Sequence, residues 1–401
     1  MTGAGPEGDA AGRCVSCCLP PQRPSGVGDF FMMREEHERW MRRALELAQR
    51  GRGRTSPNPM VGALLLKEGR IVGEGFHARA GEPHAEANAL RAAGPEAAGA
   101  TLYVTLEPCV HHGRTPPCVD AILEAGVARV IIGTRDVNPQ VAGRGVRSLV
   151  DAGVPVETGI LEEECRRLNE AYITWMTERR PFVILKAAVS LDGKIATYRG
   201  DSRWISTEGS RRRTHALRNE VDAVMVGAET VVRDDPELTV RLLEGEVRNP
   251  LRVVVDSALR IPPTSRLLTE RPEVKTLVAT TAKAPMERRE AVEALGREVL
   301  ILAERDGRVD MPALMEKLAE REVISLLLEG GGQLNASMFE AGLVDRLYVV
   351  IAPMLIGGRE APTLLDGLGA GSIKEAWRLK DLRIEEVEGD LHVEASVVKR
   401  R

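Results

Sequence analysis

Residues 101–109 read Thr-Leu-Tyr-Val-Thr-Leu-Glu-Pro-Cys, and residues 116–118 read Pro-Pro-Cys. The first six positions are rich in residues that favour a β-strand, and the Glu-Pro step should end it. The double proline opens a segment whose apolar residues repeat at helical spacing, so Cys118 is predicted in the first turn of a helix. This stretch therefore predicts a strand followed by a helix, with a cysteine just after the strand and another at the helix start.

One imidazole and two thiolates in this region form a potential zinc site. His84 follows Pro83 and begins a second predicted helix, and Cys109 and Cys118 supply sulfur. Zinc prefers four ligands, so three protein ligands leave the fourth position for water, whose pKa the metal can lower to roughly 7. Glu86 is not needed as a ligand and can move protons between that water and a leaving amine. The pattern predicts hydrolytic deamination of a nucleobase-like ring.

Two alternatives remain for these residues. The known deaminase signature is His-x-Glu followed by Pro-Cys-x-x-Cys, whereas residues 110–117 separate the two cysteines here. His111 and His112 lie in that longer loop and are rival ligands. The simplest alternative is that both cysteines are buried as small apolar residues and that His84 caps a helix. That interpretation leaves the ordered His-x-Glu and Pro-Cys pairs unexplained.

Size, charge and cysteine content restrict the class of protein. A chain of 401 residues is long enough for two domains. The formal net charge is −4, so the chain lacks the excess of basic residues that would indicate nucleic-acid binding. The short basic run Arg211-Arg212-Arg213 is interpreted as a solvated helix face. No apolar run approaches the roughly 20 residues needed to cross a membrane. Six cysteines in this length do not indicate a disulfide framework, so we predict a cytoplasmic protein.

Residues 1–33 are rich in glycine, proline and small side chains and are predicted to be a disordered extension. They lack the apolar core of a secretory signal. Cys14, Cys17 and Cys18 could suggest a second metal site, but no matching partners are evident. Met32 or Met33 is an alternative start of the protein.

Two successive α/β patterns follow. Helical spacing begins near Glu35, and residues 61–66 and 71–75 predict a hairpin, followed by alternating helices and strands through residue 157. This pattern predicts a layered α/β domain over residues 34–178. A second α/β domain is predicted over residues 179–401, and its expected strands are 182–189, 223–226, 251–256, 276–279, 323–328 and 347–351.

The second domain contains a glycine-rich turn, Glu329-Gly330-Gly331-Gly332, directly after an apolar strand. Its free amides could receive a phosphate at a helix N-terminus, or the glycines could serve packing alone. The turn lacks the Gly-x-Gly-x-x-Gly pattern of a Rossmann site. Asp234-Asp235-Pro236 could hold a metal, although a turn before proline is the favoured interpretation.

Several segments together carry a resemblance to a known family. They are His84-Ala85-Glu86, residues 105–109 and 111–118, Asn138-Pro-Gln-Val-Ala-Gly-Arg-Gly145, and Lys186 through Ser190-Leu-Asp-Gly-Lys194. The chain resembles, over roughly residues 35 to 400, the bifunctional deaminase–reductases of riboflavin biosynthesis. The long cysteine loop is that family's version of the motif. Val137 stands where the family pattern would have proline.

The resemblance implies a cytidine-deaminase-like layered α/β domain followed by a dihydrofolate-reductase-like α/β domain. The first, a zinc hydrolase, would remove the 2-amino group of 2,5-diamino-6-ribosylamino-4(3H)-pyrimidinone 5′-phosphate. The second, an oxidoreductase, would use NADPH to reduce the ribosyl group to ribityl. The product would be 5-amino-6-(5-phosphoribitylamino)uracil. Because the cofactor supplies the hydride, no side-chain nucleophile is expected in the second domain. The family is usually oligomeric, so a homo-oligomer is expected.

The resemblance also implies roles for individual positions. The zinc ligands match His84, Cys109 and Cys118, the proton donor matches Glu86, and substrate positions of the first domain match Asn58 and His77. The positions that match NADP contacts are Ala188, Trp204, Thr230, Asp234, Ser257, Gly331, Gly332, Gln333, Leu334, Asn335, Ala336 and Ser337. The positions that match substrate contacts of the second domain are Ser202, Arg218, Leu238, Arg241 and Glu329, with Lys186 as a further candidate beside the ribose. Arg218 and Arg241 could bind phosphate as guanidinium forks, or each could form a surface ion pair.

Two other functions remain as alternatives. One is a cytidine- or tRNA-type deaminase with an unrelated nucleotide-binding second domain, against which the acidic balance and long loop argue. The other is a nucleotide-binding regulator that keeps zinc only for structure. Structural zinc usually has four protein ligands, whereas three and a carboxylate are found here.

Overall fold

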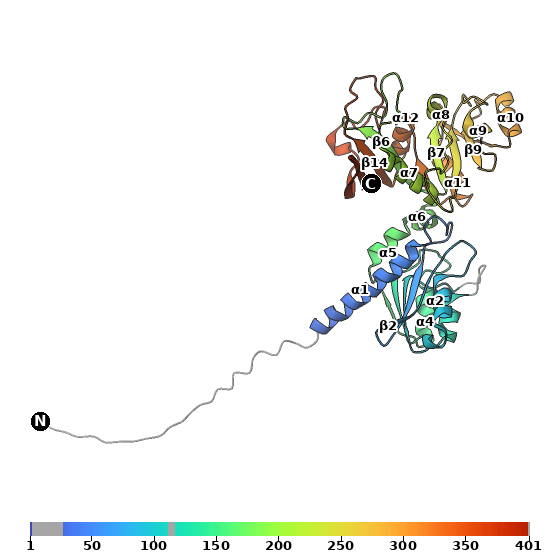
Figure 1. The fold of residues 1–401 in the computed structure, drawn as a ribbon. Coiled ribbons are helices and arrows are strands. Elements are labelled where there is room, and N and C mark those ends of the chain that lie inside the picture. The colour runs from blue at the N-terminus through green and yellow to red at the C-terminus, as the bar shows by residue number, and fades with distance from the viewer. Residues whose placement is uncertain (2–26, 111–116, 400–401) are drawn as a thin grey trace.

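The structure is a computed structural model of the 401-residue chain, and it describes residues 1, 27–110 and 117–399. Most of the N-terminal extension that was predicted to be disordered lies outside these ranges, and only its residues 1 and 27–33 are described. Also outside are the cysteines Cys14, Cys17 and Cys18 and the rival ligands His111 and His112. Figure 1 shows two bodies, one built on a five-stranded sheet and the other on a nine-stranded sheet.

The first sheet has the strand order β2-β1-β3-β4-β5. β1 pairs antiparallel with β2 and β3, while β3, β4 and β5 are parallel. The central strands β3 and β4 are almost entirely buried, as expected for near-continuous apolar runs covered on both faces. The strands are β1 (Gly62–Lys67), β2 (Arg70–Phe76), β3 (Thr101–Leu106), β4 (Arg129–Thr134) and β5 (Val156–Thr158).

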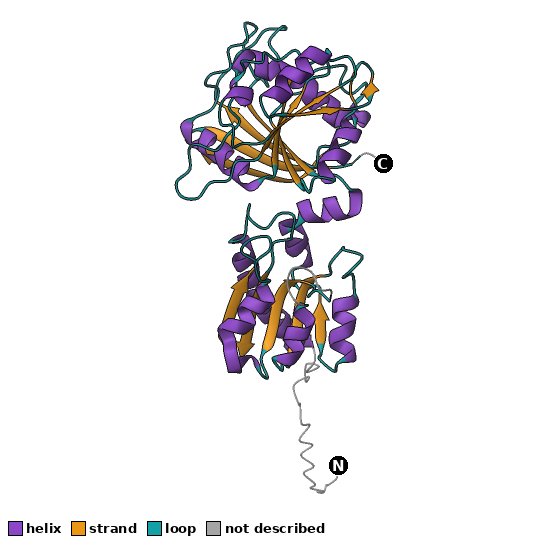
Figure 2. Ribbon diagram, turned by 90° about the vertical axis from the view of Figure 1, so that its right-hand side faces the viewer, coloured by secondary structure: helices purple, strands orange, loops and turns teal. Residues whose placement is uncertain are grey.

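Helices cover both faces of this sheet (Figure 2). Met41 and Leu47 of α1 pack in one buried cluster with Leu64 and Tyr103, while Ala85 and Ala89 of α2 belong to a second cluster with strand residues. The helices close tightly on the strands, because a Cβ at Gly62 would lie 2.0 Å from the Ala44 carbonyl oxygen. The helices are α1 (Val27–Gln49), α2 (Ala85–Ala93), the 3₁₀ turn η1 (Gly94–Ala97), α3 (Cys118–Glu124), α4 (Arg144–Asp151), α5 (Glu162–Leu168) and α6 (Glu170–Glu178).

Helix α1 begins earlier than the sequence analysis expected. We predicted an extension without structure up to residue 33 and a helix from about Glu35, but the helix starts at Val27. The last proline before it is Pro24 and the last glycine inside it is Gly28. No helix breaker follows, so the helix can continue back past the predicted start.

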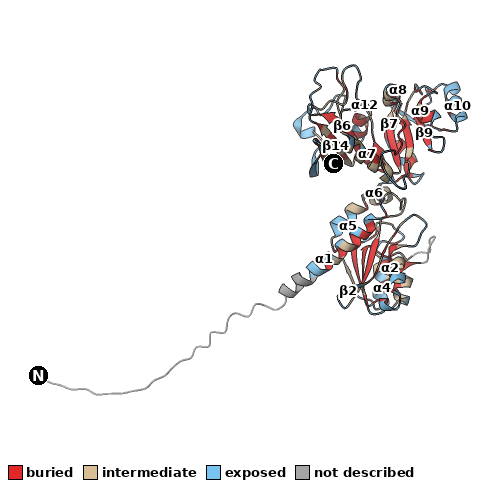
Figure 3. Ribbon diagram, viewed as in Figure 1, coloured by how far each residue is buried: buried red, intermediate tan, exposed pale blue. Residues whose placement is uncertain are grey.

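The second sheet has the order β10-β9-β8-β7-β13-β6-β14-β16-β15. It is parallel from β10 to β14, and β16 runs antiparallel to β14 and to β15. Buried side chains fill both faces of its centre, which Figure 3 shows in red. The strands are β6 (Phe182–Ser190), β7 (Ala223–Gly227), β8 (Leu251–Val255), β9 (Thr276–Thr280), β10 (Glu298–Ile301), β13 (Ser325–Leu328), β14 (Arg346–Ala352), β15 (Leu379–Val387) and β16 (Asp390–Val397).

The remaining elements of the second body pack around this sheet. β11 and β12 form a separate two-stranded ribbon. These elements are α7 (Glu208–Glu220), α8 (Ala228–Asp234), α9 (Arg266–Thr269), α10 (Met286–Ala294), β11 (Glu304–Arg305), β12 (Arg308–Val309), α11 (Met311–Ala319), α12 (Gly332–Glu340) and η2 (Ile373–Glu375). None of the helices in the described ranges is long and apolar enough to cross a membrane.

The strands predicted from apolar runs are present in both bodies, and the alternating α/β class is confirmed. The sequence analysis missed β10, the ribbon of β11 and β12, and the terminal hairpin of β15 and β16. Charged residues such as Lys380, Asp381 and Arg383 interrupt the expected apolar alternation in β15, which lies exposed at the sheet edge.

The two bodies are linked where α6 ends at Glu178 and β6 begins at Phe182. Between them, the Arg180 guanidinium makes two hydrogen bonds of 2.6 and 2.7 Å to the Asp345 carboxylate. The Trp175 indole N–H donates to the Ala319 carbonyl oxygen at 3.1 Å, so α6 contacts the second body directly.

Candidate functional site

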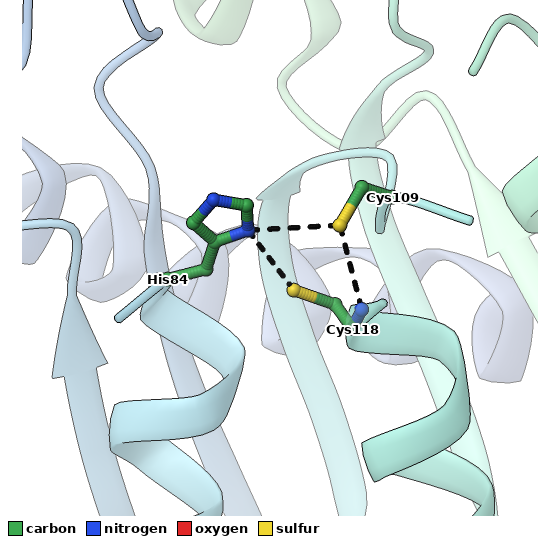
Figure 4. A group of neighbouring side chains, drawn as sticks. All are labelled: His84, Cys109 and Cys118. Carbon is green, nitrogen blue, oxygen red and sulfur yellow. Dashed lines mark hydrogen bonds between the residues drawn. The ribbon is translucent and has the colours of Figure 1, made fainter. Parts of the chain in front are cut away.

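The three predicted zinc ligands come together at the ends of neighbouring elements. His84 is the N-cap of α2, Cys109 follows β3, and Cys118 is the first residue of α3. The His84 Nδ1 atom lies 3.2 Å from the Cys118 sulfur and 3.6 Å from the Cys109 sulfur. Figure 4 shows the three side chains pointing toward one another.

This donor set fits zinc. All three ligand atoms lie within 4.8 Å of one another. Tetrahedral zinc bonded at ordinary lengths separates its nitrogen and sulfur ligands by about 3.5 Å. Of the residues that the structure describes, these three make the one group of histidine, cysteine and acidic side chains close enough to share an ion.

The thiols are already polarised by their surroundings. The Cys118 backbone N–H donates to the Cys109 sulfur at 3.4 Å. The hydrogen bond from the Cys118 thiol, with His84 beside it, lowers the pKa of Cys109 to about 4. The same bond, with burial, raises the pKa of Cys118. One thiolate therefore forms readily, and a cation would favour the second.

Glu86 lies in the first turn of α2 and is only 4% exposed. Burial, and next the negative charge of Cys109, raise the pKa of its carboxyl group to about 7. It lines the same cavity as His84 and Cys109. A carboxyl group with a pKa near neutrality can both accept and release a proton there.

The cavity around these residues has a volume of about 670 Å³. Asn58 and His77 both line it, and the Asn58 amide nitrogen lies 3.1 Å from His77 Nε2. His77 Nδ1 lies 3.2 Å from the Pro83 carbonyl oxygen, which can only accept, so the proton sits on Nδ1 and Nε2 accepts from Asn58. Burial lowers the pKa of His77, which keeps this ring neutral.

Several lining residues of this cavity were not identified from the sequence. Asp136 accepts a hydrogen bond of 3.0 Å from the Tyr172 hydroxyl, and both residues line the cavity. Trp175 and Met176 of α6 and Glu322 of the second body also line it. Asp136 and Tyr172 lie far apart in the chain, so no local spacing in the sequence marks them as neighbours.

Glu107 fixes the loop that follows β4. Its carboxylate accepts backbone N–H groups from Asp136 at 3.2 Å and from Gly143 and Val146 at 3.0 Å each. Gly145 allows this approach, because a Cβ there would lie 2.2 Å from the Pro108 carbonyl oxygen. Val137, where the family pattern has proline, lies in a loop that is held at both ends by one carboxylate.

A second cavity, of about 650 Å³, opens at the carboxyl ends of β7, β8 and β13. The predicted cofactor contacts that line it are Thr230, Asp234, Ser257, Gly331, Gly332, Gln333, Leu334 and Ser337. Ser202, which was predicted as a substrate contact, lines it too. The position leaves room for a phosphate group, because α12 begins here and a Cβ at Gly331 would meet nothing closer than Thr230 Oγ1 at 3.9 Å. Free backbone N–H groups at a helix start can receive phosphate.

Other predicted cofactor contacts lie outside the lining of this cavity. They are Ala188, Trp204, Asn335 and Ala336. Trp204 is 66% exposed, with the Arg211 guanidinium 4.4 Å from its ring centre. Asn335 is fully buried, and its amide donates to the Leu364 carbonyl oxygen at 3.0 Å.

The predicted substrate contacts Lys186, Arg218 and Glu329 form a buried charged group. Arg218 makes two hydrogen bonds to Glu329, of 2.6 and 2.7 Å. Burial opposes the ionisation of Glu329, yet Arg218 lowers its pKa. Burial, and the charge of Arg218, lower the pKa of Lys186. The sequence analysis left two interpretations of Arg218, phosphate binding or a surface ion pair. The structure shows an ion pair with Glu329, and the pair is buried instead of lying on the surface.

The predicted substrate contacts Leu238 and Arg241 lie in the segment after α8. Leu238 is 2% exposed, and the Arg241 side chain is 44% exposed and paired with Glu237 at 2.6 Å. The Arg241 backbone N–H donates to His215 Nδ1 at 3.2 Å. Burial, and then the charges of Arg218 and Arg241, lower the pKa of His215 to about 4. The histidine is therefore neutral and accepts that hydrogen bond at pH 7.

The Asp234-Asp235-Pro236 segment forms a helix end. Asp235 is the C-cap of α8 with φ of 41°, and its carboxylate accepts the Arg266 backbone N–H at 2.8 Å. These contacts agree with the turn that the sequence analysis favoured.

Comparisons with known proteins agree with this arrangement. A family described as the cytidine and deoxycytidylate deaminase zinc-binding region matches residues 34–134, and the RibD C-terminal domain matches residues 181–393. The riboflavin biosynthesis protein RibD of Actinobacillus pleuropneumoniae is 44% identical over 90% of this chain and 95% of its own length. RibD of Aquifex aeolicus is 44% identical over 90% of this chain and 98% of its own length.

Solved structures show the same two-domain architecture. Acinetobacter baumannii RibD superposes with a TM-score of 0.82 at 36% identity, covering 91% of this chain and 100% of that one. The Thermotoga maritima diaminohydroxyphosphoribosylaminopyrimidine deaminase/5-amino-6-(5-phosphoribosylamino)uracil reductase gives 0.79 at 38% identity, with the same coverage. With its zinc-binding deaminase domain and its NADPH-dependent reductase domain, the chain belongs to the RibD family of bifunctional riboflavin biosynthesis enzymes.

Proposed function

We propose that residues 34–178 hydrolyse the 2-amino group of 2,5-diamino-6-ribosylamino-4(3H)-pyrimidinone 5′-phosphate. Residues 179–401 then reduce the ribosyl group of that product to give 5-amino-6-(5-phosphoribitylamino)uracil. The observation that carries the first step is the convergence of His84, Cys109 and Cys118, together with the buried carboxyl group of Glu86, which lines the same cavity as His84 and Cys109. The resemblance of both domains to RibD proteins over nearly their whole length supports the order of the two reactions.

In the deaminase site, His84, Cys109 and Cys118 would hold a zinc ion, which would supply hydroxide at neutral pH. Glu86 takes up a proton from the attacking water and releases it to the departing amine, for which its pKa of about 7 is suited. Asn58 and the neutral His77 orient the pyrimidine ring at the wall of the cavity.

In the reductase site, the start of helix α12, over the predicted positions Gly331 to Ser337, receives the phosphates of the cofactor, and Thr230, Asp234 and Ser257 line its path. NADPH supplies the hydride. Lys186 and the Arg218–Glu329 pair hold the ribosyl group, because together they offer both donors and acceptors for its hydroxyls. Arg241 has the more exposed guanidinium and binds the substrate phosphate. Ala188, Trp204, Ser202 and Leu238 complete the proposed contacts.

A paired assay tests both halves. Ammonia release and NADPH oxidation are followed on the pyrimidine ribotide for the wild type and Glu86→Gln. We expect the variant to retain zinc by metal analysis, to lose ammonia release by roughly 10²- to 10⁴-fold, and to oxidise NADPH normally when deaminated substrate is supplied. Undiminished ammonia release would contradict the role of Glu86. Turnover of cytidine or tRNA, but not of the ribotide, would overturn the substrate assignment.

We also propose that the protein works in the cytoplasm as a homo-oligomer on small-molecule substrates, without nucleic acid or membrane partners. Free thiols as zinc ligands suit a reducing compartment. The edge strand β15 supports association, because Leu382 is 58% and Ile384 61% exposed on it. Light scattering on the purified chain tests the oligomer, and a monomeric mass would refute it.

A further inference from the structure

A short arginine-bearing hairpin stands at one end of the second cavity. β11 and β12 are joined by Asp306 and Gly307, whose φ angles are 50° and 79°. Two residues with positive φ and an Asp-Gly sequence make a tight hairpin turn, which holds its flanking residues in one geometry. Arg305 and Arg308 are direct partners across this hairpin. Their side chains therefore share a face, where two positive charges repel each other.

The hairpin is fastened to residues of the cavity wall. The Val309 backbone N–H donates to Ser257 Oγ at 3.0 Å, and the Arg308 guanidinium donates to Ser337 Oγ at 3.4 Å. Gly307, Arg308 and Val309 line the cavity together with those two serines. Arg308 is thus placed between the end of β8 and helix α12, at the same end of the cavity.

Three guanidinium groups line this cavity, and they differ in their partners. Arg233 is paired with Glu229 at 2.7 Å, and Arg260 lies 4.0 Å from Asp256, at the limit of an ion pair. Within the described ranges, neither Arg308 nor Arg305 forms an ion pair with a carboxylate. Arg308 consequently offers a positive charge to the cavity that no protein carboxylate in contact compensates.

NADPH and NADH differ in one group, a phosphate on the 2′ oxygen of the adenosine ribose. A guanidinium fork matches this dianion, whereas the 2′ hydroxyl of NADH needs no cation. We propose that Arg308, with Arg260 as a second cation, binds the 2′-phosphate and makes the reductase prefer NADPH. The inference rests on the assignment of this cavity to the dinucleotide made above.

Titration calorimetry on the full chain tests the inference apart from catalysis. The probes are adenosine 2′,5′-bisphosphate, which carries the 2′-phosphate, and adenosine 5′-monophosphate, which lacks it. We expect Arg308→Gln to weaken binding of the bisphosphate by roughly 10- to 100-fold and to change binding of the monophosphate by less than about twofold. Arg260→Gln should have the same selectivity with a smaller loss.

The matched control is Arg321→Gln, since Arg321 is a surface arginine of the same domain that pairs with Glu298 and does not line the cavity. It should change neither affinity. In steady-state assays, Arg308→Gln should raise the KM for NADPH and leave that for NADH unchanged. Equal losses for both probes, or no loss for either, would overturn the role of Arg308. Failure of the wild type to bind both probes would instead reject the cavity as the dinucleotide site.

Discussion

In the deaminase domain, the reactive groups are side chains that three neighbouring segments bring to one point, whereas the reductase cavity is formed mainly by strand ends, glycines and the start of a helix. His84, Cys109 and Cys118 converge within 4.8 Å beside a buried acid. The reductase residues are spread along a cavity of about 650 Å³, and in the part of the chain that the structure describes they include no comparable metal-binding cluster. The contrast follows from the chemistry, because a metal must be gripped by a few atoms, while a dinucleotide brings its own hydride and needs an extended surface.

The largest contrast between the domains should appear when one zinc ligand is removed. Cys118→Ser replaces a thiolate by a weak hydroxyl ligand, so we expect zinc to be lost and ammonia release to fall by roughly a thousandfold or more. NADPH oxidation on deaminated substrate should stay within about twofold of wild type, which metal analysis and the two assays measure in parallel. Cys165→Ser is the matched control, because this buried thiol belongs to no metal cluster among the described residues, so the change should leave zinc content unaltered. A fall in both activities with Cys118→Ser would show that the domains do not function separately.

The reverse experiment targets the buried pair of the reductase. Glu329→Gln removes the negative charge that accepts two hydrogen bonds from Arg218. The positive charge of Arg218 is then left near Lys186 without the Glu329 carboxylate. Removing one partner of a buried ion pair lowers the free energy of unfolding by about 3–5 kcal/mol. The reductase domain should therefore unfold at a lower denaturant concentration and lose its ability to reduce the ribotide. Zinc content and ammonia release should persist. Wild-type stability in the variant would mean that the pair contributes little to the fold.

A smaller contrast concerns the loop that Glu107 holds. Glu107→Gln keeps the shape but weakens the acceptor for three backbone N–H groups. Because that loop lines the deaminase cavity, we expect the KM for ammonia release to rise about tenfold, with zinc content and kcat less affected. Glu96→Gln, an exposed surface change in the same domain, serves as the control. A loss of kcat at unchanged KM would place Glu107 in the chemistry instead of the loop.

The smallest expected effect is a pH dependence confined to the reductase. The pKa of His215 is about 4 in the folded chain against about 6.5 when unfolded, so the unfolded state binds the extra proton between those values. Stability from this group is present above pH 6.5 and is lost as the pH falls toward 4. After solvent screening, we expect a loss of about 1–2 kcal/mol for the wild type.

His215→Asn should remove this contribution, because asparagine does not titrate but can still accept the Arg241 N–H. Denaturant titrations at pH 7 and pH 4.5, which follow the unfolding transition of the reductase domain, measure how its free energy of unfolding changes with pH in the two proteins. An identical pH dependence in both would show that His215 is not the group responsible. The deaminase transition should respond alike in both proteins.

The sequence alone predicted most of what depends on close neighbours in the chain. The Pro83-His84 helix start, the strand before Glu107 and the helix start at Cys118 all appear as expected. So do the apolar strands that were predicted for the two sheets, although β10 was not among them. What it missed was governed by exposure or distance: the charged edge strand β15, and the contact between Asp136 and Tyr172.

The proposed zinc ligands could be named from the sequence because each follows a local signal: a helix start after proline, or the end of a β-strand. Only the tertiary structure could pair Arg218 with Glu329, extend Glu107 to the loop at Val146, or bring Arg308 beside Ser257 and Ser337. These contacts join segments whose distance depends on strand order and crossover connections. Strand order emerges when the whole sheet packs, and no short stretch of the chain encodes it.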